Sequence, residues 1–170
     1  MNITIKLAAY FLSKSPGQIL SNSRLTALIY LCDWKYCLIN NSPLTNIVWH
    51  NENNGPFSWQ VIDDIIHERK FFMINKSLGA FISLNTSIKL VDYLNELRLG
   101  ISEDMFRVMN FVNHQTVSLS KEELSSLVLS TYPIIRSKKF SDLNLKRLAI
   151  EYKLSRLWRI EAESLNIPEL

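Results

Sequence analysis

The feature that most constrains the fold is a long, almost entirely apolar helix predicted over residues 23–40, with Ser23 as its N-cap. At helical spacing its apolar residues form two stripes and leave only a narrow polar sector: Leu25, Leu28, Ile29, Cys32, Tyr36 and Ile39 in one, Ala27, Tyr30, Leu31, Trp34 and Leu38 in the other. Asp33 and Lys35 interrupt the stretch, so it is no membrane span, which needs about 18 or more apolar residues. Such a helix is expected at the centre of the molecule, packed on several sides.

The rest of the chain indicates more helices and a small β element. Helices are predicted over 3–13, after a Ser58 cap, after a Ser102 cap, after the Ser120 capping box and up to a stop at Pro133, and from Ser141 or Asp142 to Ser164. An extended segment is predicted over 44–50, a loop over 51–56, a hairpin with strands 71–74 and 80–84, and a short helix over 91–97.

Length and composition favour one domain of the α+β class, predominantly α-helical. The 170 residues are 47% apolar, and neither a repeat nor a composition break marks a linker. We therefore expect a compact single domain over 1–170, with a long central helix and a small β-hairpin or short sheet. The poor signal-peptide character of the N-terminus and two cysteines without disulfide or zinc spacing favour a cytoplasmic protein with reduced thiols.

The residues that commonly carry catalysis do not gather into a known motif. His50, His67 and His114 share no metal-ligand spacing, and no nucleotide-binding or nucleophile-elbow motif is present. Asp63 and Asp64 would point about 100° apart on a helix, which makes them a solvated flank. The sequence therefore predicts no catalytic residues, no metal site and no cofactor, and the protein is not expected to be an enzyme.

Charge placement is the one feature above background. The net charge of +3 divides into zero over residues 1–135, +6 over 136–159 and −3 over the last eleven residues. In the final helix Leu145, Leu148, Ala149 and Tyr152 line one side, whereas Leu143, Ile150, Leu154, Leu157 and Trp158 line a nearly opposite side. Either both stripes lie in the core, or one stripe with its basic flanks receives another protein. Phosphate or nucleic-acid binding is a third, less favoured interpretation.

The order of short motifs over 25–56 resembles the central signature of the Panacea domain of bacterial and phage antitoxins. The matching elements are Leu28-Ile29-Tyr30, Leu31-Cys32-Asp33-Trp34, the turn Ser42-Pro43-Leu44, the dipeptide Gly55-Pro56 and, downstream, Ser130-Thr131-Tyr132-Pro133. The resemblance implies a small α+β antitoxin that binds and neutralises a toxin encoded beside it. Related members act as adaptors that deliver the toxin to a host protease.

Partner contacts are expected around the Gly-Pro loop and on the basic helix. The candidate partner-binding residues are Trp49, Gly55, Pro56, Phe57, Trp59, Arg136, Arg147, Leu154 and Trp158. The aromatic residues among them either anchor a partner or fill the core. Two alternatives to the antitoxin function stay open: a phage or mobile-element protein that blocks a host defence factor, and a nucleic-acid binder that uses the basic helix. A homodimer also stays open.

Overall fold

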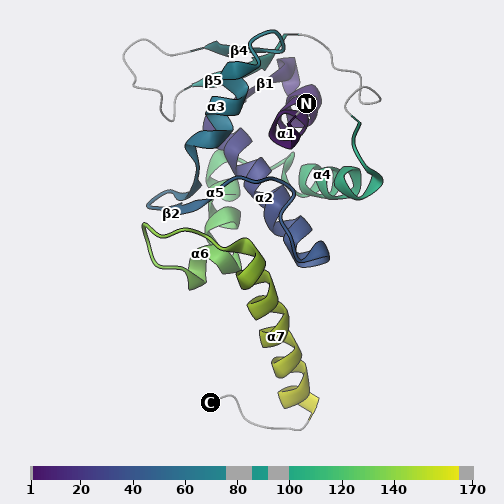
Figure 1. Ribbon diagram of the computed structural model, residues 1–170, viewed down its shortest axis with the longest axis vertical. Coiled ribbons are helices and arrows are strands. Elements are labelled where there is room, and N and C mark those ends of the chain that lie inside the picture. Colours follow the sequence, from purple (N-terminus) through teal and green to yellow (C-terminus); the bar gives the residue numbers. More distant parts are fainter. Residues whose placement is uncertain (1, 76–85, 92–99, 165–170) are drawn as a thin grey trace.

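The computed structural model describes residues 2–75, 86–91 and 100–164. Helix α2 (Asn22–Asn40) runs through the middle of the molecule (Figure 1). It packs against α1 (Ile3–Lys14), α4 (Glu103–Thr116), α5 (Lys121–Leu129) and α7 (Leu145–Ser164). Leu25, Ile29 and Tyr30 on this helix are completely buried. The central position predicted from the two apolar stripes is therefore confirmed, and so is the mostly helical α+β class.

The N-cap of α2 differs from the prediction by two residues. The Ser21 hydroxyl, not that of Ser23, accepts the Arg24 backbone N–H at 3.2 Å. The helix therefore begins at Asn22, directly after the short strand β1 (Ile19–Ser21). At the other end Asn41 adopts a left-handed conformation, with φ of 58°, and closes the helix.

A three-stranded antiparallel sheet lies at the end of the molecule near α1 (Figure 1). Its order is β1-β5-β4, with β4 (Phe72–Asn75) and β5 (Ser87–Leu90) paired so that Ile74 faces Ile88. The first strand of the predicted hairpin is thus present. Its predicted partner strand, 80–84, lies outside the described residues. So does the predicted helix 91–97, apart from Val91, which is not helical.

The loop predicted over 51–56 is instead a second hairpin. Strand β2 (His50–Glu52) pairs with β3 (Gly55–Phe57), which leads into α3 (Trp59–His67). Gly55 has φ of 113°, a conformation that side-chain-bearing residues rarely adopt, so a glycine is needed where β3 begins. Residues 46–49, within the segment predicted as extended over 44–50, belong to no helix or strand, and only His50 of that segment lies in a strand.

Two predicted helix boundaries in the C-terminal half are wrong. Pro133 does not end a helix: α5 ends at Leu129, and Pro133 lies in the first turn of the short helix α6 (Tyr132–Arg136), where its missing N–H costs no hydrogen bond. The last helix begins at Leu145 rather than at Ser141 or Asp142. The cap at Ser102, the capping box of Ser120 with Glu123 and the cap at Ser58 are confirmed.

A buried carboxylate fixes α2 to the extended segment that follows it. Asp33 is completely buried, and its Oδ1 accepts the Thr45 backbone N–H at 2.8 Å. Its Oδ2 accepts the Thr45 hydroxyl and the Trp49 indole N–H, the latter at 2.8 Å. Burial raises the pKa of Asp33, while these donors act in the opposite direction by stabilising the ionised form. Cys32 and Cys37 are free and buried nearby.

We predict that Asp33→Ala lowers the free energy of unfolding by about 3 kcal/mol or more, because each buried donor left without an acceptor costs about 1–3 kcal/mol. Urea denaturation followed by Trp fluorescence measures this change. Asp63→Ala, at an exposed position of α3, is the matched control and should alter stability by less than about 0.5 kcal/mol. Equal stability of the two variants would contradict the structural role of Asp33.

Candidate partner-binding surface

The predicted contact residues around the Gly-Pro dipeptide divide between the core and the surface. Trp49 is buried, with its ring 5.5 Å from that of Tyr30 and its indole N–H bonded to Asp33, so it fills the core. Gly55 is also buried, against Val128 and Leu129 of α5. These residues hold the hairpin in place and present no surface to a partner.

The following aromatic residues remain accessible. Trp59 is 58% exposed, and its ring meets the half-buried Phe57 edge-on at 4.9 Å. Pro56 is also half-buried. The pair at the start of α3 is thus a small aromatic surface carried by a fixed hairpin.

Asn51 links the hairpin to the chain that leads into α7. Its side-chain amide is completely buried and donates to the carbonyl oxygens of Ile134, Ser137 and Lys138, at 3.0 to 3.3 Å. Its backbone exchanges hydrogen bonds with the same connection, since the Asn51 N–H donates to Ser141 and the Asn51 carbonyl accepts from Phe140. Residues 138–143 are therefore hydrogen-bonded to the hairpin and to Trp49 before it. Because their backbone groups are used in these bonds, α7 begins only at Leu145.

The inner face of α7 is part of the core. Leu145, Leu148 and Ala149 are buried against the body of the molecule. One turn later the ring of Tyr152 lies between Trp34 of α2, at 6.0 Å, and Tyr132 of α6, at 5.3 Å. This face anchors the first half of the helix, and the second half projects away from the other elements (Figure 1).

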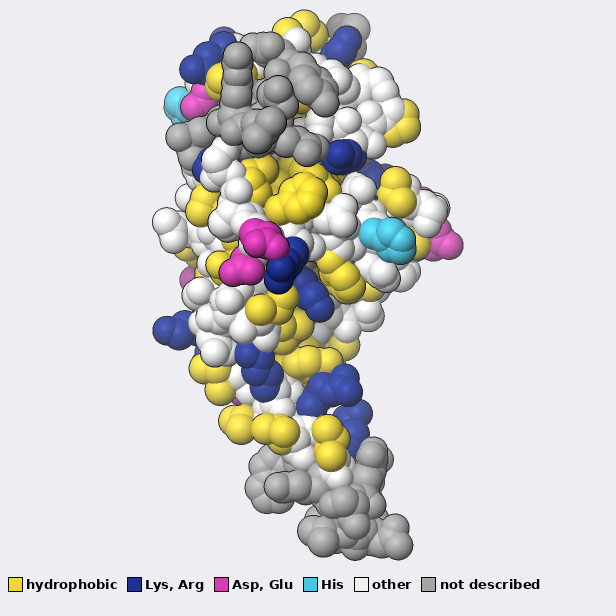
Figure 2. Space-filling model, turned by 90° about the vertical axis from the view of Figure 1, so that its right-hand side faces the viewer, with side chains coloured by type: hydrophobic (Ala, Val, Ile, Leu, Met, Phe, Trp, Pro, Cys, Tyr) yellow, Lys and Arg dark blue, Asp and Glu magenta, His cyan; other side chains and the backbone are white. Residues whose placement is uncertain are grey.

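The opposite side of α7 is an exposed apolar stripe. Ile150, Leu154 and Leu157, here called the outer stripe, are 43%, 52% and 59% exposed. Along the projecting half, hydrophobic side chains alternate with Lys and Arg on the face shown in Figure 2. The first predicted stripe lies in the core, whereas Ile150, Leu154 and Leu157 of the second lie at the surface. Leu143, also predicted for the second stripe, precedes α7 and is buried. Arg147 and Arg136 are also exposed, whereas the side chain of Trp158 lies outside the described part.

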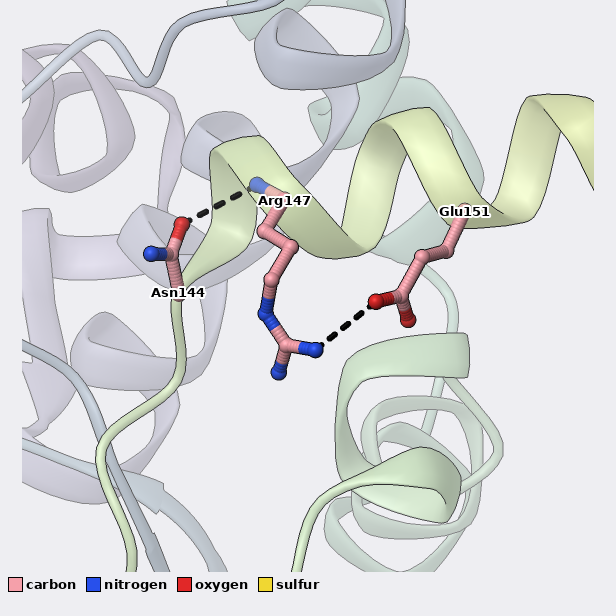
Figure 3. A network of polar contacts seen from close by, with 3 residues as sticks. All are labelled: Asn144, Arg147 and Glu151. Carbon is pink, nitrogen blue, oxygen red and sulfur yellow. Dashed lines mark hydrogen bonds and ion pairs between the residues drawn. The ribbon is translucent and has the colours of Figure 1, made fainter.

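Polar contacts hold the start of α7 and one of its basic residues. The Asn144 side chain accepts the Arg147 backbone N–H at 3.0 Å and caps the helix (Figure 3). The Arg147 guanidinium extends along the outside of the helix to the Glu151 carboxylate at 2.7 Å. Arg136 lies over the ring of Tyr132, 5.9 Å from its centroid. The exposed guanidinium of Arg147 is therefore partly neutralised.

Two kinds of chemical site can be checked among the described residues: metal-ligand clusters and activated nucleophiles. Among them, no three His, Cys, Asp or Glu side chains lie close enough to share a metal ion. Burial raises the pKa of the Cys32 thiol and of the Tyr30 phenol, so both stay protonated and neither is an activated nucleophile. Within ranges 2–75, 86–91 and 100–164, no helix is both long enough and apolar enough to span a bilayer.

Sequence reasoning missed two exposed apolar residues, one in α6 and one in the connection between α6 and α7. Ile135 and Phe140 are 66% and 68% exposed, and Phe140 has the left-handed φ of 61° that bulky residues rarely adopt. Its conformation depends on the long-range hydrogen bond from its N–H to Asn51, at 2.7 Å. No local signal in the sequence announces such a contact.

A protein-family comparison matches residues 25–132 to the family described as "Antitoxin SocA-like, Panacea domain". The match includes α2, the hairpin, α3, α4 and α5, and it ends where α6 begins. No curated protein and no solved structure matches the chain significantly.

We predict that the two sides of α7 respond oppositely to the same substitution. Leu148→Glu should lower the thermal midpoint strongly, because an unpaired charge at a 1% exposed position costs several kcal/mol. Leu154→Glu should leave the midpoint nearly unchanged, since that side chain already meets solvent. Thermal melting followed by circular dichroism distinguishes the two, and an equally large loss for Leu154→Glu would show that the outer stripe is covered in the folded protein.

Proposed function

Because the chain belongs to the family of SocA-like antitoxins with a Panacea domain, we propose that it is a non-enzymatic antitoxin that binds and neutralises a toxin protein. The single observation that carries the proposal is the family match over residues 25–132. A partner is inherent in this function, and an antitoxin needs a stable framework that displays a recognition surface rather than convergent titratable groups.

Two features of the structure support direct binding of another protein. Two of the residues that resemble the family signature lie in the interior: Tyr30 bonds to Thr131 at 2.8 Å, and Asp33 bonds to Trp49. The outer stripe of α7 leaves apolar surface in solvent on a helix whose other face is firmly anchored. Neutralisation then occurs by covering the active surface of the toxin, or by presenting the bound toxin to a host protease.

The basic segment 136–159 makes nucleic-acid binding the second candidate function. Most of its cations already contact the protein itself. The contacts are Arg136 with Tyr132, Lys139 with Asn51, Arg147 with Glu151, Lys153 with Asn41 and Arg156 with Tyr152. Glu151 is the only charged group among these partners, so the segment keeps most of its positive charge. We favour a protein partner because the exposed cations of α7 alternate with exposed aliphatic side chains.

The antitoxin function predicts a growth phenotype. Induced expression of the gene adjacent to this one should arrest growth, and co-expression of this chain should restore it, because the partner is then held in an inactive complex. Colony counts after induction measure both effects. Asp33→Ala, which is expected to unfold more readily, is the control for a requirement for folded protein. A neighbouring gene that is harmless alone, or arrest that the chain does not relieve, would contradict the proposal.

The same experiment separates blocking from delivery to a protease. If the chain acts by covering the toxin, the amount of toxin in the cell should stay constant or rise during rescue. If it acts as an adaptor, the toxin should disappear faster when the chain is present. Immunoblotting of an epitope-tagged toxin after translation is stopped gives the two half-lives.

Electrophoretic mobility shift assays test the nucleic-acid alternative. We expect no shift of duplex DNA or RNA at about 150 mM salt, because the basic residues of α7 alternate with exposed aliphatic ones and form no continuous basic surface for several phosphate contacts. A shift that disappears steeply as salt is raised would instead favour nucleic-acid binding.

A further inference from the structure

We propose that the outer stripe of α7 docks an acidic amphipathic helix, which lies along the exposed side of α7 from Ile150 to Leu157. The inference rests on the proposed antitoxin function, in which this helix belongs to the toxin. It adds the site, the secondary structure and the charge of the segment that the antitoxin recognises.

The spacing of the outer stripe suits a helical partner. Ile150, Leu154 and Leu157 are separated by four and three residues, the spacing of apolar positions in the seam between two packed helices. They remain exposed because the contacts of α7 with α2 and α6 lie on its other side. At the N-terminal end of the stripe, Ile150 lines a shallow hollow of ≈ 280 Å³ together with Asn144, Lys146, Arg147 and Glu151. A side chain of a facing helix could occupy this hollow as a knob.

Charge decides between the occupants that such a seam admits. Residues 145–160 contain five basic residues and one acidic residue, Glu151, so their net charge is +4. At about 100° per residue, Lys146 and Lys153 flank one edge of the outer stripe and Arg147 flanks the other. A second copy of α7 would bring like charges together along the edge that carries Lys146 and Lys153, which is destabilising. A helix with Asp or Glu beside its apolar seam would find opposite charges there.

The helix is held rigidly enough to serve as a preformed platform. Its inner face is anchored at Leu148 and Ala149, and Tyr152 is packed between two aromatic rings. The Lys153 ammonium also donates to the Asn41 side chain at the end of α2, at 2.7 Å. Because α7 is already ordered, little conformational entropy is lost on docking. The family match ends at residue 132, so this platform lies outside the matched range.

Two synthetic peptides of about three heptads test the proposal with the full-length chain. Both carry the same leucine and isoleucine seam, and the positions flanking it are glutamate in one peptide and lysine in the other. Isothermal titration calorimetry should show the glutamate peptide binding at least about tenfold more tightly, since several exposed charge pairs each contribute a fraction of a kcal/mol. The advantage should shrink as salt is raised.

Variants on α7 locate the binding surface. The double variant Leu154→Glu with Leu157→Glu should weaken binding of the glutamate peptide by at least about tenfold. Ser155→Glu, on the same projecting half but away from the outer stripe, adds a negative charge without removing apolar contact, and should weaken binding far less. Circular dichroism confirms that each variant is folded.

Three results would overturn the inference: equal affinity for the two peptides, binding of neither, or equal losses for the stripe variant and Ser155→Glu. So would a homodimer, measured by light scattering, that Leu154→Glu converts to a monomer, because the occupant would then be a second copy.

If the chain rescues growth but the stripe variant rescues equally well, the inference fails and the antitoxin function stands. If the glutamate peptide binds at the stripe but no rescue occurs, the antitoxin function fails and the acidic helix belongs to another protein.

Discussion

The buried carboxylate of Asp33 is the interaction on which the rest of the structure depends. It lies on the central helix α2 and accepts hydrogen bonds from both the backbone and the hydroxyl of Thr45 and from the Trp49 indole. These bonds turn the chain back along α2 and bring Trp49 edge-on against Tyr30. A buried acid without such donors would be strongly destabilising, so the segment after α2 and the helix itself require each other.

From this point the fold is extended by further buried polar links rather than by apolar contact alone. Tyr30 reaches the Thr131 hydroxyl at the start of α6, and Asn51 holds the carbonyl oxygens that follow this helix. Each link joins residues that are far apart in the sequence, and each belongs to or adjoins a motif of the antitoxin family. The signature residues therefore specify the framework, because directional hydrogen bonds fix register where apolar packing tolerates several arrangements.

The helical part of this fold was accessible from the sequence because its signals are local. Apolar spacing predicted α2 as the central helix, and the Ser102 and Ser120 caps stood within a residue of the helices they begin. The errors lie where distant residues decide. Proline usually ends a helix, but Pro133 lies in the first turn of α6. The start of α7 lies later than the local sequence predicts, because residues 138–143 pair with the segment around β2, a contact between distant residues. Likewise, periodicity showed two stripes on α7, but only the packing of Tyr152 shows which stripe is buried.

The residues that hold the fold together are therefore different from the exposed residues of the outer stripe. Residues that contribute buried donors or acceptors, such as Asp33 and Asn51, cannot be exchanged without a large loss of stability. The outer stripe, Ile150, Leu154 and Leu157, contributes no buried hydrogen bond. Substitutions at such exposed positions usually change the free energy of unfolding by less than about 0.5 kcal/mol. Under the proposed function, substitutions on the outer stripe and its basic flanks would change the recognised helix while the interior stays constant.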